Sequence, residues 1–326
     1  MDSEPRTRVW RDGALEKEGF PVAEISDYLE QDGTVVWLDL CAPEPEDLQV
    51  ITEELGLAPL AVEDALSEHE RAKLDRYPQH LFLNVYSVRL DTASGELSAT
   101  EVSAFVTKRA LVTVRQRPDF DVEELLARWD AQQDLAQYGV AFLLHNLIDL
   151  VVDQHFTAVQ ALDAEIESLE DLLFAERVGD QLVQRRSFEL RKSLVRLRQV
   201  VLPMREVVNT LLRRDLHVVP ESMAPYFQDV YDHALRAAEW TDSLRDLVTS
   251  ILETRIAMQG NRLNQVMKKL TAWAAIIALP TAVTGFYGQN VPYPGSQQHW
   301  GFIVSTALWA AGGVTLYVLF RVRDWL

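Results

Sequence analysis

The sequence predicts an α+β soluble part, followed by long helices and by a C-terminal pair of membrane-spanning helices. The first reason is the distribution of charge. The chain has 326 residues with 31 basic and 49 acidic side chains, yet residues 270–320 contain no Asp, Glu, Lys or Arg. The second reason is periodicity, which changes from short strand-like runs before residue 115 to helical spacing after residue 120. A mixed domain, a helical region and a membrane hairpin should therefore follow one another along the chain.

The first part, residues 1–118, is expected to be an α/β domain. Short runs rich in β-branched and aromatic residues predict four strands. They lie at Val35–Leu40, His80–Val88, Val102–Thr107 and Ala110–Arg115. The segment Glu44–Gly56 predicts a helix, because acidic residues occupy its first turn and a glycine ends it.

The next part, residues 119–221, is expected to form long antiparallel helices. Apolar residues recur every three or four positions over Val140–Phe174 and again over Gln181–Arg213. A third helical pattern begins near Ser222 and continues without a convincing break to Tyr287, so that residues 222–287 should form one helix that enters the membrane.

Two apolar runs near the C-terminal end predict the membrane hairpin. Leu270–Tyr287 and Gly301–Phe320 are each long enough to cross a hydrocarbon core of about 30 Å. Residues 288–300 between them are rich in turn-forming residues, and residues 321–326 form a basic tail. The alternative is a buried hairpin of a soluble core, but both runs are apolar all round rather than amphipathic.

The flanking charges predict the orientation of this hairpin. Lys268 and Lys269 precede the first span, Arg321 and Arg323 follow the second, and the connecting loop has no Lys or Arg. Because basic residues stay on the cytoplasmic side, both termini should be cytoplasmic and the short loop external. The polar first ten residues do not resemble a signal peptide. We expect a multi-pass protein of the cytoplasmic membrane, with the lipid bilayer as one of its partners.

Composition excludes several classes of function. A net charge of −18 argues against nucleic acid as a partner, because phosphate backbones require a basic surface. The single cysteine, Cys41, rules out an intrachain disulfide. The sequence has no Gly-rich phosphate loop and no recognisable nucleophile motif, so we do not expect an enzyme.

Two spans per chain cannot enclose a water-filled path, so a pore would need several copies around one axis. The first span is the better candidate for the lining helix, because small or polar residues recur on one of its faces in a heptad-like stripe. The stripe consists of Asn264, Met267, Thr271, Ala274, Ala278, Thr281, Gly285 and Gly288. The alternative is that it serves only close packing between helices.

Several segments of the sequence resemble those of a known family. Tyr287-Gly288-Gln289-Asn290 is similar to the Tyr-Gly-Met-Asn motif that ends the pore helix of CorA-type divalent-cation channels. The similarity extends to four further segments and covers the chain from about Val35 to Leu326. These segments are LAVEDAL with HERAKLDRY (residues 60–66 and 69–77), LHNLIDLVVDQHF (144–156), PYFQDVYDH (225–233) and NQVMK (264–268).

The resemblance implies a homopentameric channel whose cytoplasmic part is a funnel with long stalk helices. It implies that Mg²⁺ is the transported and regulatory ion, with Co²⁺, Ni²⁺ or Zn²⁺ as alternatives. Gly288, Gln289 and Asn290 would form the selectivity filter. The pore lining would consist of Asn264, Met267, Leu270, Ala274, Ala278 and Thr281. Regulatory ions would bind between subunits at Asp64 and Asp229, with Glu63 and His233 as weaker candidates.

Two features keep other functions open. Gln289 replaces the usual Met of the motif, and the external loop has no acidic residue, so a proton-coupled zinc transporter resembling ZntB is the close alternative. A membrane-anchored cytoplasmic sensor is an alternative of another class.

Two further clusters carry both a metal-binding and a structural interpretation. His145, Asp149 and Asp153 are spaced four residues apart on one helical face, where contacts that support the helix are the favoured interpretation. A second cluster, of acidic residues, lies near a helix end, and a solvated surface is its favoured interpretation. It consists of Glu165, Glu167, Glu170 and Asp171.

Overall fold

The computed structural model describes residues 4–67, 71–91, 94–174, 180–213, 216, 218–289, 291–296 and 298–326. The chain divides into two compact units, Met1–Thr249 and Ser250–Leu326, and the long helix α7 (Ala224–Tyr287) contributes residues to both. The first unit contains a mixed sheet with helices, and the second consists of the end of α7 and one further helix.

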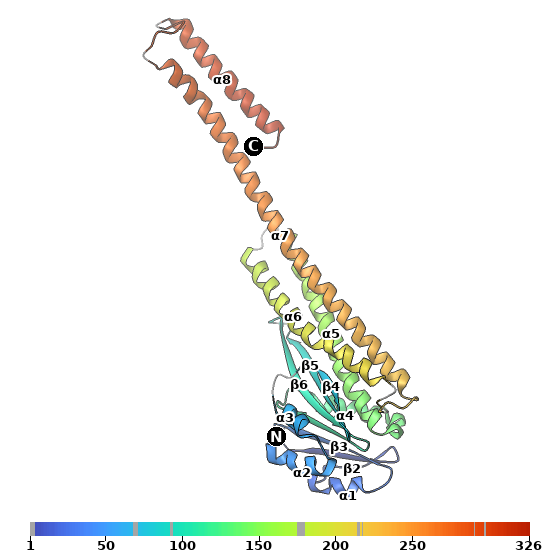
Figure 1. Ribbon diagram of the computed structural model, residues 1–326. Helices are drawn as coiled ribbons and strands as arrows, with labels where there is room; N and C mark the ends of the chain where they lie inside the picture. The colour runs from blue at the N-terminus through green and yellow to red at the C-terminus, as the bar shows by residue number, and fades with distance from the viewer. Residues whose placement is uncertain are drawn as a thin grey trace. The chain divides into compact units, whose positions relative to one another are not determined.

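The first unit is built on one seven-stranded sheet with the order β2-β1-β3-β7-β6-β5-β4 (Figure 1). Only β3 and β7 run parallel, and the remaining neighbours are antiparallel. The strands are β1 (Arg6–Arg11), β2 (Ala14–Glu18), β3 (Thr34–Cys41), β4 (Lys73–Arg76), β5 (Leu81–Asp91), β6 (Glu96–Val106) and β7 (Ala110–Arg115).

Helices cover both faces of this sheet. One face packs against α1 (Ile25–Leu29), α2 (Pro45–Leu55) and α3 (Pro59–Leu66). The other packs against α4 (Val122–Ala131), α5 (Val140–Phe174), α6 (Asp180–Leu211) and the beginning of α7. Two short 3₁₀ helices lie at Val22–Glu24 and Gln133–Tyr138.

Alternation along the central strands separates the two cores. On β3, Val36 and Leu38 point to the α1–α3 side, whereas Trp37 points to the α4–α7 side. On β7, Leu111 points to the α4–α7 side and Val112 points to the α1–α3 side. Because both faces are buried, the central strands β3 and β7 are largely apolar, which is why the sequence identifies them.

The structure confirms the predicted fold class and most of its elements. All four predicted strands are present, as β3, β5, β6 and β7, and α2 ends at Gly56 in the left-handed conformation with φ of 62°. Three strands were not predicted. β2 is fully exposed and β4 has only four residues, so neither carries a hydrophobic signal, while β1 contains three arginines.

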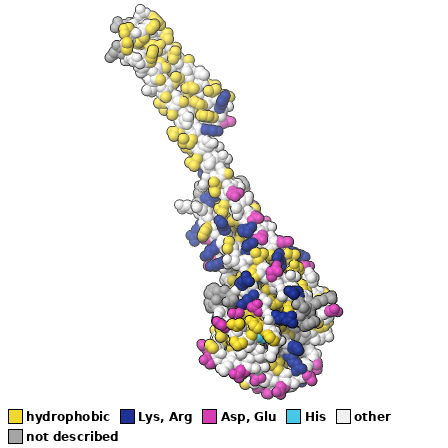
Figure 2. Space-filling view, in the orientation of Figure 1, with side chains coloured by type: hydrophobic (Ala, Val, Ile, Leu, Met, Phe, Trp, Pro, Cys, Tyr) yellow, Lys and Arg dark blue, Asp and Glu magenta, His cyan; other side chains and the backbone are white. Residues whose placement is uncertain are grey.

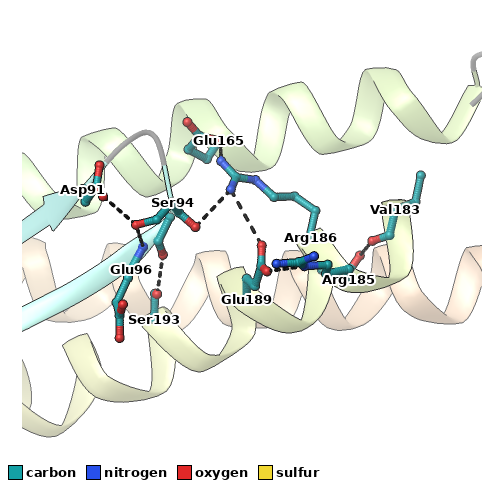
Figure 3. Close-up of polar contacts among 11 residues, drawn as sticks. Asp91, Ser94, Glu96, Glu165, Val183, Arg185, Arg186, Glu189 and Ser193 are labelled. Atoms are coloured by element: carbon teal, nitrogen blue, oxygen red, sulfur yellow. Dashed lines mark hydrogen bonds and ion pairs between the residues drawn. The ribbon is translucent and has the colours of Figure 1, made fainter. Parts of the chain in front are cut away.

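The end of the β5–β6 hairpin is fastened to the helices beside it (Figure 3). Arg186 on α6 forms an ion pair with Glu165 on α5 and donates from Nη1 to the Ser94 carbonyl at 3.4 Å. Ser193 donates from Oγ to the Gly95 carbonyl at 2.7 Å. The hairpin therefore joins the sheet to the α5–α6 pair at a point far from the sheet's centre.

The second unit is a helical hairpin of α7 and α8 (His299–Val322). Both helices are long and apolar enough to span a membrane. Large apolar side chains such as Ile277, Phe302 and Val314 are more than 60% exposed on the isolated chain, and Figure 2 shows hydrophobic side chains covering this part. Such exposure excludes the buried hairpin of a soluble core, because a soluble core would bury these residues.

Candidate functional site

One face of helix α7 packs against α8. Ala272 and Val283 are buried on this face, and Leu279 lies so close to Gly312 of α8 that a Cβ atom at Gly312 would stand 2.5 Å from the Leu279 Cδ2 atom. Around the axis of α7, Ala272, Leu279 and Val283 point in directions that differ by at most about 40°, at 100° per residue. The contact therefore fixes which side of α7 faces its own α8.

The predicted pore-lining residues lie on the other side of α7. At 100° per residue, their directions centre about 150° from the face that contacts α8. Each of them is exposed on the chain, namely Asn264, Met267, Leu270, Ala274, Ala278 and Thr281. These residues are therefore not used for packing within the hairpin, and they remain available to helices of other copies of the chain or to lipid.

Helix α7 ends at the predicted filter motif. Gly288 follows the last helical residue and donates its N–H to the Thr284 carbonyl at 2.8 Å, and Gln289 donates to the Phe286 carbonyl at 3.3 Å. A Cβ atom at Gly288 would stand 3.0 Å from the Thr284 oxygen, so a side chain there would crowd the last turn. Gln289 is exposed, and Asn290 lies outside the described residues.

The predicted regulatory carboxylate of Asp64 is already engaged. Asp64 lies on α3, and its Oδ2 atom accepts from Lys73 Nζ of β4 at 2.7 Å. Glu63, the preceding residue, is exposed and takes no part in this pair. The sequence analysis missed Lys73, because the polar strand that carries it was not predicted.

The other predicted regulatory residues lie on α7. The Asp229 side chain is 70% exposed, and its Oδ2 atom lies 4.0 Å from His233 Nδ1, one helical turn further on. Asp64 and Asp229 belong to helices on opposite faces of the sheet, so one subunit does not bring them together. Within the described residues, no group of three or more His, Cys, Asp or Glu side chains could hold a metal ion. A metal site that uses both aspartates would therefore need two subunits.

The cluster at His145, Asp149 and Asp153 is structural, as the favoured interpretation held. Arg128 of α4 donates to Asp149 and to Asp153, each at 2.8 Å, and lies 3.4 Å from Glu124. Burial, and then the neighbouring Asp153 carboxylate, raise the pKa of Asp149, and Arg128 opposes them. The His145 ring makes edge-on contacts with Tyr226 and Phe227 of α7, and burial lowers its pKa. This cluster joins α4 to α5.

The fold and the exposed membrane hairpin define a class of protein, a membrane protein with a large α/β soluble part. Residues 32–323 match the family model of the CorA-like Mg²⁺ transporter proteins, and the chain belongs to this family. It is therefore a member of a divalent-cation transporter family.

Individual relatives agree with this assignment. The chain is 31% identical to the cobalt/magnesium transport protein CorA of Thermotoga maritima over 296 residues, which cover 90% of this chain and 84% of that protein. It is 25% identical to the zinc transport protein ZntB of Cronobacter sakazakii over 86% of each chain. The complete structure of the CorA magnesium transporter from Methanocaldococcus jannaschii superposes with a TM-score of 0.78 at 20% identity and covers 98% of both chains.

Proposed function

We propose that this protein is a homopentameric channel for divalent cations, with Mg²⁺ as its main ion and Co²⁺ and Ni²⁺ as further ions. One observation carries the proposal. The small and polar stripe on α7 is exposed on the side away from α8 and leads to Gly288 and Gln289 at the helix end. Copies arranged around an axis through this stripe would form a path lined by α7, with α8 as an outer layer.

Selectivity is assigned to Gly288, Gln289 and Asn290. Mg²⁺ gives up its water shell reluctantly, so a filter can bind the hydrated ion through that shell. A ring of five Asn290 amides would offer neutral oxygens, which hold a divalent ion weakly enough to release it. Gly288 gives the chain room to turn at this point, because its missing Cβ avoids the Thr284 oxygen.

In the proposed orientation, the hairpin spans the cytoplasmic membrane and both termini lie in the cytoplasm. In this orientation the acidic first unit would sense the cytoplasmic ion concentration. Asp64 of one subunit and Asp229 of the next would bind a regulatory Mg²⁺, with Glu63 and His233 close by. Bound ions would offset the repulsion between carboxylates and hold the closed state, and loss of the ions would favour opening.

A proton-coupled zinc transporter is the second candidate. Two observations favour it. Gln289 places an amide where the motif of CorA-type channels has the thioether of Met. In the described part of the external loop, the titratable side chains are Tyr293 and His299, so the loop offers no carboxylate. The 25% identity to the zinc transport protein ZntB of Cronobacter sakazakii is compatible with this candidate.

The proposal is tested by ion uptake into liposomes that contain the purified protein. Asn290→Ala should abolish selective Mg²⁺ uptake while the oligomer still assembles, and Gln289→Met should have a milder effect that shifts ion preference. Gln298→Ala is a matched control, because it removes an amide from the same loop outside the motif. Unchanged Mg²⁺ uptake in Asn290→Ala would remove Asn290 from the filter. A monomer that conducts would contradict the pentamer.

A further inference from the structure

The ammonium group of Lys73 is held at Asp64 by groups from three elements. Its Nζ atom lies 2.7 Å from Oδ2 of Asp64 on α3 and 3.6 Å from Oδ2 of Asp75 on β4. It also lies 5.8 Å from the centre of the Phe82 ring on β5. The Lys73 side chain is only 23% exposed, so the ammonium occupies a defined position rather than a random surface one.

The pattern of the strand explains this position. Lys73 and Asp75 are two residues apart on β4, so their side chains lie on one face of the strand. Asp75 pairs with Phe82 across the antiparallel ladder, and Phe82 is fully buried. The lysine stem therefore lies along an apolar ring while its head reaches the helix that carries Asp64.

The ammonium lies where an ion would have to bind. A carboxylate oxygen that accepts from an ammonium at 2.7 Å cannot be a close ligand of a divalent cation without displacing it. Repulsion between a cation at Asp64 and the lysine charge would also weaken ion binding. Lys73 has a flexible four-carbon stem, which allows the ammonium to withdraw when an ion arrives.

We infer that Lys73 is a tethered cation that competes with the regulatory divalent ion for Asp64 and thereby sets the ion concentration at which the cytoplasmic site fills. The inference rests on the proposed regulatory role of Asp64 and Asp229. In the ion-free protein, Lys73 would also neutralise one of the two carboxylates, so that the repulsion between neighbouring subunits is smaller than two free aspartates would give. The competition raises the Mg²⁺ concentration needed for closure.

The test measures Mg²⁺ binding to the full-length protein in lipid nanodiscs by calorimetric titration. The regulatory component is defined as the binding that disappears when Asp64→Asn and Asp229→Asn are combined. Lys73→Met keeps the apolar stem and removes the charge, so this component should become at least tenfold tighter, which corresponds to about 1.4 kcal/mol. Lys73→Arg keeps the charge and can pair with the carboxylate through two N–H groups, so it should bind Mg²⁺ no more tightly than the wild type.

The chain provides a matched control in Lys17. Its ammonium likewise pairs with a carboxylate, Glu24, at 3.2 Å and lies 5.9 Å from the rings of Phe20 and Tyr28. Lys17→Met should leave Mg²⁺ affinity within twofold of the wild type, and an equal gain in both methionine variants would contradict a specific role for Lys73.

The outcomes separate this inference from the proposed regulation. A wild-type component that depends on Asp64 and Asp229, with unchanged or weaker affinity in Lys73→Met, overturns the inference alone. A wild type without such a component overturns the proposed regulation and this inference together, while uptake into liposomes still tests transport.

Discussion

The Nη1 atom of Arg128 on α4 lies 2.8 Å from Oδ2 of Asp149 on α5. This contact gives the polar face of α5 a structural role. The guanidinium also reaches Asp153, so both carboxylates are used for helix packing rather than for a metal ion. The regulatory site proposed at Asp64 and Asp229 does not use these two carboxylates.

Replacing Arg128 should destabilise the first unit. Arg128→Gln leaves Asp149 and Asp153 close together without a counter-charge, and proton uptake by Asp149 would offset only part of the repulsion. Because the group is partly exposed, we expect a loss of about 2 kcal/mol, less than for a fully buried pair. Thermal unfolding in detergent measures it. Arg198→Gln, which breaks the more exposed pair with Asp242, is the control and should change stability little.

Arg186 should protect the end of the β5–β6 hairpin. Arg186→Met removes both the ion pair with Glu165 and the bond to the Ser94 carbonyl. Amide hydrogen exchange at residues 94–98 should become about tenfold faster, because local opening loses about 1.4 kcal/mol of resistance. The neighbouring Arg185 is 81% exposed and pairs with Glu189, so Arg185→Met should leave exchange there unchanged. An equal increase in the exchange rate in both variants would show that the Arg186 contacts do not specifically protect the end of the hairpin.

His155 should make the protein sensitive to acid. Its Nε2 atom lies 2.7 Å from the Tyr86 carbonyl, and complete burial lowers its pKa to about 4. Between this value and the ordinary pKa of about 6.5, the unfolded chain binds a proton that the folded chain excludes. Its contribution is therefore fully present above pH 6.5 and declines as pH falls toward 4, by about 3 kcal/mol in total.

The variant His155→Gln tests this sign. Glutamine can still donate to the Tyr86 carbonyl but does not titrate, so the fall in thermal midpoint between pH 7 and pH 5 should be smaller than in the wild type. Parallel pH profiles for the two proteins would show that His155 is not responsible for acid sensitivity.

Two adjacent glycines on α8 should respond differently to the same change. At Gly312 a Cβ atom would stand 2.5 Å from Leu279, whereas at Gly313 nothing lies within 4 Å. Gly312→Val should separate α7 from α8 and reduce the yield of assembled protein in size-exclusion chromatography, and Gly313→Val should not. A loss of assembly in Gly313→Val alone would contradict the packing described for the hairpin.

The sequence predicted those elements whose residues carry a strong periodic signal. Val140–Phe174 predicted α5 to the residue, and α7 begins two residues after the predicted Ser222, because long apolar faces at helical spacing leave few alternatives. β2 and β4 could not be predicted in the same way, because they are polar strands held by their neighbours in the sheet.

The face of α7 that carries the candidate residues was predictable from the sequence, but the contacts of those residues were not. Periodicity placed Met267 and Thr281 on one face of a helix, and the structure adds that this face lies away from α8. Asp64 was singled out by resemblance, but its partner Lys73 is nine residues away in an unpredicted strand. The relation between the two depends on how α3 packs beside β4, which local sequence does not determine.

Flux of divalent cations through the purified protein in liposomes tests the central claim most directly. The measurement compares Mg²⁺, Co²⁺, Ni²⁺ and Zn²⁺ with and without a pH gradient. A channel for Mg²⁺ predicts uptake down the Mg²⁺ gradient that is independent of the pH gradient and is lost in Asn290→Ala. Zn²⁺ uptake that requires a pH gradient would favour the second candidate. Absence of flux for all four ions would contradict the account and leave the hairpin as the membrane anchor of a cytoplasmic sensor.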